Sequence, residues 1–468
     1  MPRVDAFPPY TKASQFPSPQ TPYVPYLDFL RPPTAQAPQH PPRPDLPPPP
    51  PGYTRTVHAS PAAWPKQLDG SKGDYSRLST PFGAVPATES KEERGARVQS
   101  EKLKCVSERL ACNEWKLDEA SKGDQPAQWL AAERWRRDVQ VPGGLTLLFA
   151  HANGLNKETW FPIARRVVAN DPQALGAVFG TGEPLSRATN VVINDMWFLD
   201  DTHHGVSVDL NAGVLSSRYA WADWGREMLN FATHILPAYS STNTHQWQLG
   251  WHEEGKAPKT PNLVAVGHSY GGNGLVQASV TRPDVFSSLF LIEPMCNAAI
   301  MSLNIKADYP IVHAAIKRRS NWPSMKDAAA MRKNPLFATW HDEVFDTWLS
   351  HHLVPVDPSN PDGEVTLATP TWAEAAVFSD PNGSIRGWDK LYEITVPAGF
   401  LMAGNEDWMG GEKLAQEIAG RAPRTRNERV MKAGHLLPQE APEEAAEALW
   451  RFFTTLAAGD WDKVKSKI

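Results

Sequence analysis

The stretch GHSYGG, residues 267–272, places Ser269 in a G-x-S-x-G pattern. A serine hydroxyl can attack a carbonyl carbon when a base takes its proton, an acid orients the base and N–H groups bind the oxyanion. The apolar residues Leu263 to Val266 predict a buried strand before the serine, and a helical pattern follows it. This strand–turn–helix context is typical of a nucleophile elbow. It favours Ser269 as a nucleophile over a serine that merely occupies a tight turn.

His435 is the candidate base. The segment RVMKAGHLLPQEAPEE, residues 429–444, places it between the last predicted strand and the final helix, in a loop marked by Gly434 and Pro438. The base that serves a nucleophile elbow usually lies after the final strand. The chain has 14 histidines, so position alone distinguishes His435 from an ordinary surface histidine.

Three carboxylates compete for the role of the acid. Asp407 occupies the fourth position of a G-x-x-D turn that begins at Gly404, and we expect it to orient His435. Glu293, at the end of the strand in LIEPM, is the alternative, and Glu406 is a weaker candidate. If Asp407 has no catalytic role, it is a helix N-cap, as aspartates often are.

Two backbone N–H groups are candidates for the oxyanion hole. One belongs to Tyr270, directly after the nucleophile, and the other to Asn153 in the turn HANG. Removing one such donor typically lowers turnover by about 100- to 1000-fold. Because the backbone path matters here more than the side chain, we expect Asn153 to tolerate substitution better than Gly154.

The surrounding elements alternate between strands and helices. Strands are predicted at 145–150, 189–195, 262–269, 287–294, 395–404 and 426–434, and helices at 221–236, 272–282, 412–420 and 441–456. Two earlier segments, 102–119 and 128–138, are expected to be edge strands. This alternation predicts an α/β fold with a mostly parallel sheet covered by helices on both faces. Ligands bind such sheets at the carboxyl ends of the strands, where Ser269 would lie.

The domain organisation follows from two segments that break this rhythm. Residues 296–394 are too long for a loop and carry helical patterns, so we expect an inserted helical cap between two core segments, 96–295 and 395–460. Residues 1–95 form a proline-rich lead, since 20 of the 44 prolines fall within residues 1–70, and we expect the lead to be largely disordered. Within it, Pro38, Pro41 and Arg43 fit a P-x-x-P-x-R ligand for an SH3-type partner, although a solvated spacer is the simpler explanation.

Composition excludes several classes of function. The net charge is -5 and 21% of residues are charged, which indicates no nucleic-acid partner. Three cysteines in 468 residues argue against a disulfide framework, fit a reducing compartment and show no metal-ligand spacing. We expect no cofactor, no secretory signal and no transmembrane segment. The composition is that of a soluble intracellular protein.

From about Lys102 to its end, the chain resembles capped α/β hydrolases, in particular a fungal group that includes a peroxisomal lipase and hydrolase-like proteins of host-selective toxin clusters. The stretches that carry the resemblance are LTLLFAHANGLNKETW, THHGVS, VAVGHSYGG, SLFLIEPM, RKNPLFATWHDEVFDTWLSHHL, VTLATPTWAEAAVF, GNEDWM and KAGHLLPQEAPE. The chain departs from the usual pattern in having HANG where many relatives have H-G, and in its proline-rich lead.

The resemblance implies an α/β-hydrolase fold and a serine hydrolase that acts on esters or thioesters of apolar acyl groups, a lipid-like or acyl small molecule, through Ser269, Asp407 and His435. Epoxide hydrolases and dehalogenases of this fold need a carboxylate nucleophile, and Ser269 argues against them. The remaining alternative is a non-enzymatic receptor or partner module with the same fold.

The carboxyl end, residues 461–468, carries a further signal. Ser466, Lys467 and Ile468 form a close variant of the S-K-L tripeptide that the peroxisomal import receptor binds. We therefore expect a peroxisomal location, with the cytoplasm as the alternative if the tail is merely a basic end.

Overall fold

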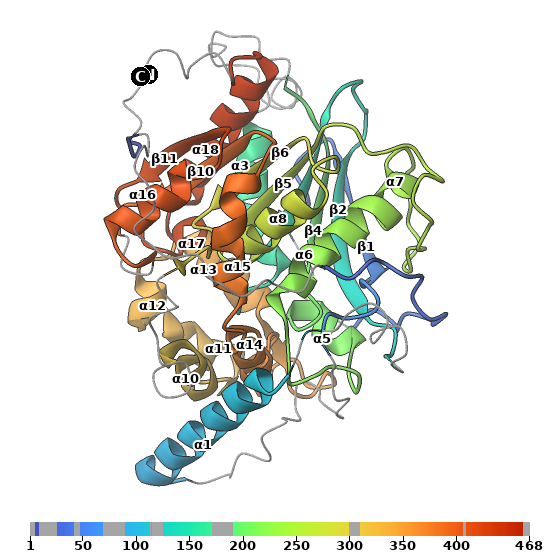
Figure 1. The fold of residues 1–468 in the computed structure, drawn as a ribbon. Helices are drawn as coiled ribbons and strands as arrows, with labels where there is room; N and C mark the ends of the chain where they lie inside the picture. The colour runs from blue at the N-terminus through green and yellow to red at the C-terminus, as the bar shows by residue number, and fades with distance from the viewer. Residues whose placement is uncertain are drawn as a thin grey trace.

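The computed structural model describes residues 5–8, 26–41, 47–68, 89–112, 114, 125–170, 191–298, 309–405 and 409–461. Within them, one sheet of eight strands has the order β1-β2-β4-β3-β5-β6-β10-β11 (Figure 1). Its strands are β1 (Tyr53–Pro61), β2 (Trp129–Arg137), β3 (Leu145–Ala150), β4 (Ile193–Leu199), β5 (Leu263–His268), β6 (Ser288–Ile292), β10 (Ala398–Ala403) and β11 (Thr425–Val430). β2 runs antiparallel to β1 and β4, and the strands from β4 to β11 run parallel. The predicted mostly parallel sheet is confirmed.

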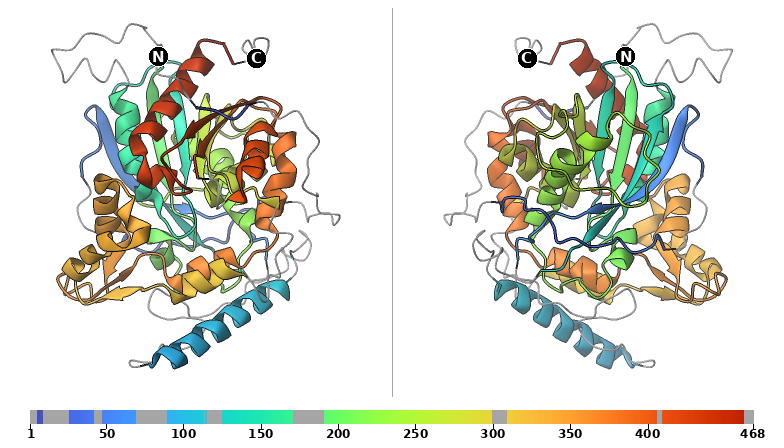
Figure 2. Two further views of the ribbon diagram at one scale, coloured as in Figure 1. Left: turned by 90° about the vertical axis from the view of Figure 1, so that its left-hand side faces the viewer. Right: turned by 90° about the vertical axis from the view of Figure 1, so that its right-hand side faces the viewer.

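The sheet is buried on both faces because alternate residues of its strands point to opposite sides. In β3, Leu148 and Ala150 face one apolar core, while Leu147 and Phe149 face the other. The first core lies under α6 (Trp221–Asn230), α8 (Tyr270–Thr281), α15 (Gly383–Lys390) and α16 (Glu412–Gly420), and the second under α3 (Phe161–Ala169) and α18 (Pro442–Ala457). The two helical layers are visible on either side of the strands in Figures 1 and 2.

A cap lies at the carboxyl ends of the parallel strands (Figure 2). Its helices are α10 (Pro310–Lys317), α11 (Met325–Ala329), α12 (Pro335–Ala338), α13 (Asp342–His351) and α14 (Thr371–Phe378). The structure adds a small antiparallel sheet that the sequence did not predict, with β7 (Asn321–Trp322), β9 (Val365–Leu367) and β8 (Leu353–Pro355) in that order. It also differs at the end of the predicted cap, because α15 packs on α8 and α6 in the helical layer of the core.

The lead also differs from the prediction. Residues 53–61, expected within a largely disordered segment, form β1, which pairs with β2 from Tyr53 to Pro61. An unpaired β2 edge would leave a row of backbone groups without partners, and β1 satisfies them. His58 and Ser60 are fully buried there. The expectation of disorder is therefore wrong for this stretch, because pairing with the edge of β2 stabilises it as a strand.

The expected strand at 102–119 is wrong over its first part, which belongs to helix α1 (Lys91–Leu110). The helix begins with a capping box, in which Ser90 and Glu93 each bond the other's backbone N–H. Val98, Cys105 and Val106 lie on one face and pack on α10 and α14 of the cap. The S-x-x-E signal at Ser90 lies upstream of residue 102, and the helical spacing from Val98 to Val106 runs across residue 102; both are present in the sequence.

The position of β4 also corrects the prediction of a strand at 189–195. The strand runs over Ile193–Leu199 and thus includes Asp195 near its start. The Asp195 carboxylate is buried between two guanidinium groups of β2, 2.7 Å from Arg134 and 2.8 Å from Arg136. Because these partners compensate the buried charge, an aspartate that normally marks a strand end is tolerated inside the strand.

Candidate active site

Ser269 lies in the turn between β5 and α8 with φ 53° and ψ −115°, a backbone conformation that non-glycine residues rarely adopt. Its side chain is largely buried. Two glycines make the turn possible, since a Cβ at Gly267 would meet the backbone N of Gly272 at 2.8 Å and one at Gly271 would meet the carbonyl O of Ala150 at 2.3 Å. Such a strained turn presents the serine hydroxyl at the end of the sheet, as a nucleophile elbow does.

His435 lies in the loop between β11 and the short helix α17 (Leu437–Glu440), where its ring faces the serine. Its Nε2 is 2.9 Å from Ser269 Oγ, within hydrogen-bond distance of the proton that a base would remove. The backbone carbonyl of His435 is 2.9 Å from Nε2 of His268, the residue before the serine. Burial, together with the neighbouring His435, lowers the pKa of His268 to about 3, so the His268 ring is neutral and donates to that carbonyl. The loop carrying His435 is thus fixed to the elbow.

Glu293, the first residue after β6, faces the other side of the His435 ring. Its Oε2 lies 3.2 Å from His435 Nδ1, and its Oε1 accepts the backbone N–H of Ala403 at 2.7 Å. Glu293 is 1% exposed and has φ 45°. The described chain has three non-glycine residues with positive φ, and two of them are Ser269 and Glu293. Backbone strain therefore coincides with the two partners of His435.

Asp407, the expected acid, and Glu406 lie outside the described residues. The candidate acid that the structure brings to His435 is Glu293, the alternative from the sequence. The side chains of Ser269, His435 and Glu293, in this order, have the geometry of a serine triad, in which the acid fixes the ring and the ring activates the hydroxyl.

The expected oxyanion donors lie on two adjoining segments. Tyr270 is the first residue of α8, so its backbone N–H is one of those that a helix N-terminus leaves without an intrahelical acceptor. The turn carrying Asn153 follows β3, whose end is in close contact with the elbow through Gly271. The Asn153 side chain is engaged elsewhere, since its Nδ2 donates to the carbonyl of Glu374 at 3.1 Å and its Oδ1 lies 2.8 Å from His204 Nε2.

An aromatic cluster of the cap covers this end of the sheet. Its large members are Trp322, Phe337, Trp340, Phe345 and Trp348. The same cluster includes Ala152 and Leu155, on either side of the Asn153 turn, and Leu436, next to His435. The cap thus packs an apolar cluster against the segments that flank the candidate nucleophile, beside the paired side chains of Glu374 and Arg318.

Sequence reasoning assigned no role to His268, or to Asp201 and His204 behind the oxyanion turn. For His268, the signal was its place directly before the nucleophile at the end of a buried strand, where a polar side chain must find a partner. For Asp201 and His204, the signal was a run of polar residues, DDTHH, directly after the apolar end of β4. Their contacts depend on the fold and could not be paired from the sequence.

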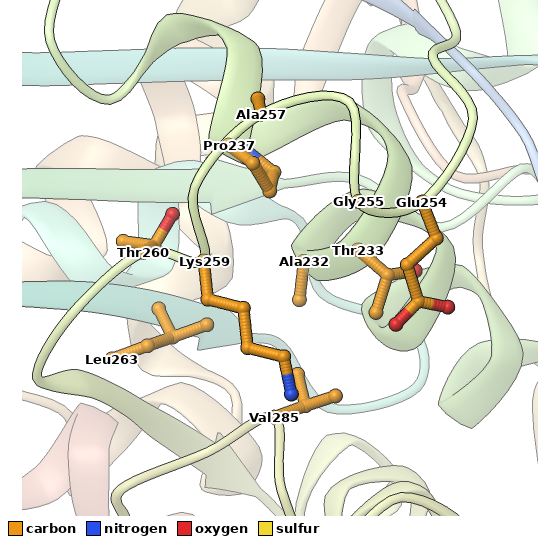
Figure 3. Close-up of a pocket in the computed structure, with 10 residues that line it drawn as sticks. All are labelled: Ala232, Thr233, Pro237, Glu254, Gly255, Ala257, Lys259, Thr260, Leu263 and Val285. Atoms are coloured by element: carbon orange, nitrogen blue, oxygen red, sulfur yellow. The ribbon is translucent and has the colours of Figure 1, made fainter.

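A separate pocket is lined by residues between positions 232 and 285 of the core, outside the cap (Figure 3). Its lining residues are Ala232, Thr233, Pro237, Glu254, Gly255, Ala257, Lys259, Thr260, Leu263 and Val285. The charged side chains there are already paired, Lys259 with Asp284 and Glu254 with Arg282. None of the candidate catalytic residues lines this pocket.

The other predicted partner sites are only partly described. The carbonyl of Pro38 accepts the indole N–H of Trp247 at 2.7 Å, Pro41 is half-buried, and Arg43 and Ser466 to Ile468 lie outside the described residues. Among the residues that are described, no helix has the length and apolar character to cross a membrane, and no group of His, Cys, Asp or Glu is placed to hold a metal. All three cysteines are described, and all are free.

Comparison with known proteins gives consistent matches. A model of the alpha/beta hydrolase family matches residues 147–448. The abhydrolase domain-containing protein AFT2-1 of Alternaria alternata is 28% identical over 217 residues, 40% of this chain and 81% of that protein. The peroxisomal membrane protein LPX1 of Saccharomyces cerevisiae is 30% identical over 168 residues, 36% of this chain and 35% of that protein.

Two further matches concern activity and fold. The type I acyl-CoA thioesterase mpaH of Penicillium roqueforti is 25% identical over 258 residues, 51% of each chain. The crystal structure of the peroxisomal alpha-beta-hydrolase Lpx1 superimposes with a TM-score of 0.57 at 16% identity, over 87% of this chain and 90% of that one. At this identity the superposition establishes a shared fold.

Proposed function

This chain belongs to the alpha/beta hydrolase family, and on that premise we propose that it is a serine hydrolase of carboxylic esters or thioesters with apolar acyl groups. One observation carries the proposal: the His435 ring lies between Ser269 Oγ at 2.9 Å and Glu293 Oε2 at 3.2 Å. An ordinary surface histidine or turn serine is not expected to form such a buried series of contacts. The residues at its two ends, Ser269 and Glu293, both have strained backbones.

In the proposed reaction, Ser269 Oγ attacks the carbonyl carbon of the substrate while His435 Nε2 takes the hydroxyl proton. Glu293 accepts from Nδ1 and stabilises the imidazolium that forms. The backbone N–H groups of Tyr270 and Asn153 bind the negative oxygen of the tetrahedral intermediate. His435 then gives its proton to the leaving alcohol or thiol, and a water molecule, activated by the same ring, releases the acid from the acyl-enzyme.

The apolar acyl group of the proposed substrate is supported by the aromatic cluster of the cap. This cluster contacts the chain on both sides of the Asn153 turn and next to His435. Apolar side chains therefore lie against the segments that flank Ser269, and they favour a hydrocarbon substituent over a charged one. The relative named as an acyl-CoA thioesterase supports a thioester as well as an ester as the bond that is cleaved.

We propose a peroxisomal location. It is supported by the tripeptide Ser466-Lys467-Ile468 and by the similarity to a protein named as peroxisomal. The proposed partner is the import receptor. Deleting residues 466–468 should leave a fluorescently tagged chain in the cytoplasm, whereas unchanged peroxisomal staining would refute a role for the tripeptide. An SH3-type partner at Pro38, Pro41 and Arg43 is tested separately, by pull-down with the full chain and an Arg43→Ala variant.

The proposed activity is tested by incubation with a fluorophosphonate probe, which labels activated serines. We expect labelling of the intact protein and none of Ser269→Ala. His435→Ala should be labelled at least 100-fold more slowly, because the Ser269 hydroxyl has lost its base. Ser279→Ala, a change at another buried serine, is the matched control and should label normally. An unlabelled intact protein would favour the receptor alternative, and labelling of Ser269→Ala would place the nucleophile elsewhere.

A further inference from the structure

A buried polar cluster lies behind the oxyanion turn, with the carboxylate of Asp201 at its centre. Asp201 Oδ1 accepts the hydroxyl of Thr202 at 3.0 Å and the backbone N–H of His203 at 3.2 Å. Its Oδ2 accepts the hydroxyl of Tyr270 at 3.1 Å and lies 3.4 Å from His204 Nδ1. Burial alone would raise the pKa of Asp201, but the contact with His204 and the nearby His203 holds it below its usual range, so the carboxylate is ionised.

The first connection runs from Asp201 to the elbow through the side chain of Tyr270. The hydroxyls of Tyr270 and Tyr219 are 2.8 Å apart. Each hydroxyl has one proton and a carboxylate can only accept, so Tyr219 donates to Tyr270 and Tyr270 donates to Asp201. The Tyr270 ring packs edge-on against Trp221, with ring centroids 5.1 Å apart. The residue whose backbone N–H is a proposed oxyanion donor is therefore fixed at its far end to Asp201.

The second connection runs from Asp201 to the oxyanion turn through His204. Nε2 of this ring lies 3.1 Å from the backbone N of Gly154 and 2.8 Å from Asn153 Oδ1. An unprotonated Nε2 accepts the Gly154 N–H, and a protonated one donates to Asn153. The ring joins the turn to the carboxylate when Nδ1 carries a proton and faces Asp201 as the donor. This holds for the neutral ring whose Nε2 accepts the Gly154 N–H and for the imidazolium whose Nε2 donates to Asn153.

The third connection uses the backbone of Asp201. Its N–H donates to His151 Nε2 at 3.1 Å, and His151 Nδ1 lies 2.8 Å from the carbonyl O of Ala152. Burial, aided by the neighbouring His204, lowers the pKa of His151 to about 3. The ring is therefore neutral, with Nε2 accepting and Nδ1–H donating to Ala152 at the start of the turn.

From these three connections we propose that Asp201 is a positioning residue, which holds the backbone N–H groups of Tyr270 and Asn153 at the separation that an oxyanion requires. The two donors come from different segments, the β5–α8 elbow and the turn after β3, and must both lie about 2.7–3.1 Å from one oxygen atom. A single buried anion, bonded to Tyr270 of the elbow and in contact with the His204 ring that binds the turn, supplies that constraint. The inference rests on the proposed hydrolase function for its catalytic meaning, but the anchor itself can be measured without a substrate.

The anchor is tested by amide hydrogen exchange in Asp201→Asn and Tyr270→Phe, both of which keep the backbone donors. The control is Tyr239→Phe, which removes another buried hydroxyl, one that accepts from Gln246 at 2.8 Å and Gly250 at 2.7 Å. We expect Asp201→Asn to raise exchange at least tenfold in both the 152–154 turn and the start of α8, relative to the rest of the sheet. Tyr270→Phe should raise it mainly at the start of α8. If these segments exchange no faster than in Tyr239→Phe, the anchor is refuted, whether or not the protein is a hydrolase.

Catalysis gives the second readout. With a p-nitrophenyl ester, kcat should fall about tenfold in Tyr270→Phe and about 100-fold in Asp201→Asn, with KM nearly unchanged, since a whole oxyanion donor contributes about 100- to 1000-fold. Affinity for a trifluoromethyl ketone, which forms the tetrahedral adduct, should fall in parallel. Because both changes act through Asp201, the double variant should lose no more than Asp201→Asn alone. A double variant whose losses multiply to about 1000-fold, or variants with a higher KM at constant kcat, would overturn the positioning role. An intact protein without esterase activity would refute the proposed function instead.

Discussion

Replacing Glu293 by glutamine separates the orienting role of its carboxylate from its packing, because the two side chains have nearly the same shape. In the native protein both carboxylate oxygens are used, Oε1 by the Ala403 N–H at 2.7 Å and Oε2 by His435 Nδ1 at 3.2 Å. A glutamine must point its amide nitrogen at one of these two groups. An amide nitrogen facing the Ala403 N–H would set two donors against each other in a buried site, at a cost of about 1–3 kcal/mol.

The amide oxygen is therefore expected to stay with Ala403, and the amide nitrogen to face His435. There it donates to Nδ1, which selects the tautomer that carries its proton on Nε2. In that tautomer the ring cannot accept the proton of Ser269. The corresponding change of acid to amide in serine proteases lowers kcat by about 10⁴-fold, and we expect a loss of about 10³- to 10⁴-fold here. At 1.36 kcal/mol per tenfold, this is about 4–5.5 kcal/mol of transition-state stabilisation.

The assay compares kcat for a p-nitrophenyl ester and the rate of fluorophosphonate labelling in the intact protein, Glu293→Gln and Asp407→Asn. Thermal unfolding serves as the check that each variant is folded. We expect Glu293→Gln to lose activity while Asp407→Asn stays within about tenfold of the intact protein. If Glu293→Gln stays within tenfold and Asp407→Asn loses the larger factor, then Asp407 is the acid and the tautomer argument is wrong.

Three further predictions follow from local geometry. Gly154→Ala should lower kcat more than Asn153→Ala, because Gly154 has φ +77° and a Cβ there would meet Glu374 Oε1 at 2.6 Å, whereas Asn153→Ala keeps its backbone N–H; the opposite order in steady-state kinetics would contradict this. Burial lowers the pKa of His58 from its ordinary 6.5 to about 4, so between these pH values the protein takes up a proton at His58 when it unfolds. As pH falls from 6.5 to 4, its free energy of unfolding should fall by about 1.4 kcal/mol per pH unit relative to that of His58→Gln. Urea unfolding at several pH values measures this difference, and a constant difference would refute it. Val106→Ala, at a position with 0% exposure in α1, should lower the free energy of unfolding by about 2 kcal/mol in the same assay, and no loss would show that α1 does not support the cap.

The sequence predicted the parallel part of the sheet well because its strands are buried on both faces. Segments such as LVAVGH and LTLLFA are continuous apolar runs next to helical patterns, and no tertiary contact has to be known to recognise them. Ser269 was predicted as a candidate for the same reason, since it directly follows the apolar run of β5. His435 was predicted from chain order instead, because β11, the strand before it, is polar and only partly buried. Chain order then placed them at one edge of the sheet.

The parts that were missed depend on long-range partners. β1 has mixed polarity and becomes a strand because β2 offers it an edge, and β4 tolerates Asp195 because Arg134 and Arg136 lie opposite. The contact of Glu293 with His435 joins residues 142 positions apart. The sequence left this carboxylate and Asp407 as alternatives because both follow strands that are neighbours in the sheet. α1 is a different case, since its capping box was a local signal that could have been used.

The path of the chain before β2 bears on how the cap can be exchanged between relatives. The chain passes from β1 at the edge of the main sheet to α1, which packs on α10 and α14, and returns to the sheet at β2. The cap is therefore not a single insertion that can be cut out between β6 and β10. A chimaera that transplants only that segment would bring a foreign surface against α1, whose residues Val98 and Val106 fit the native helices. A chimaera with a stably packed cap must therefore take α1 and the cap from the same relative, although the two pieces are far apart in the sequence.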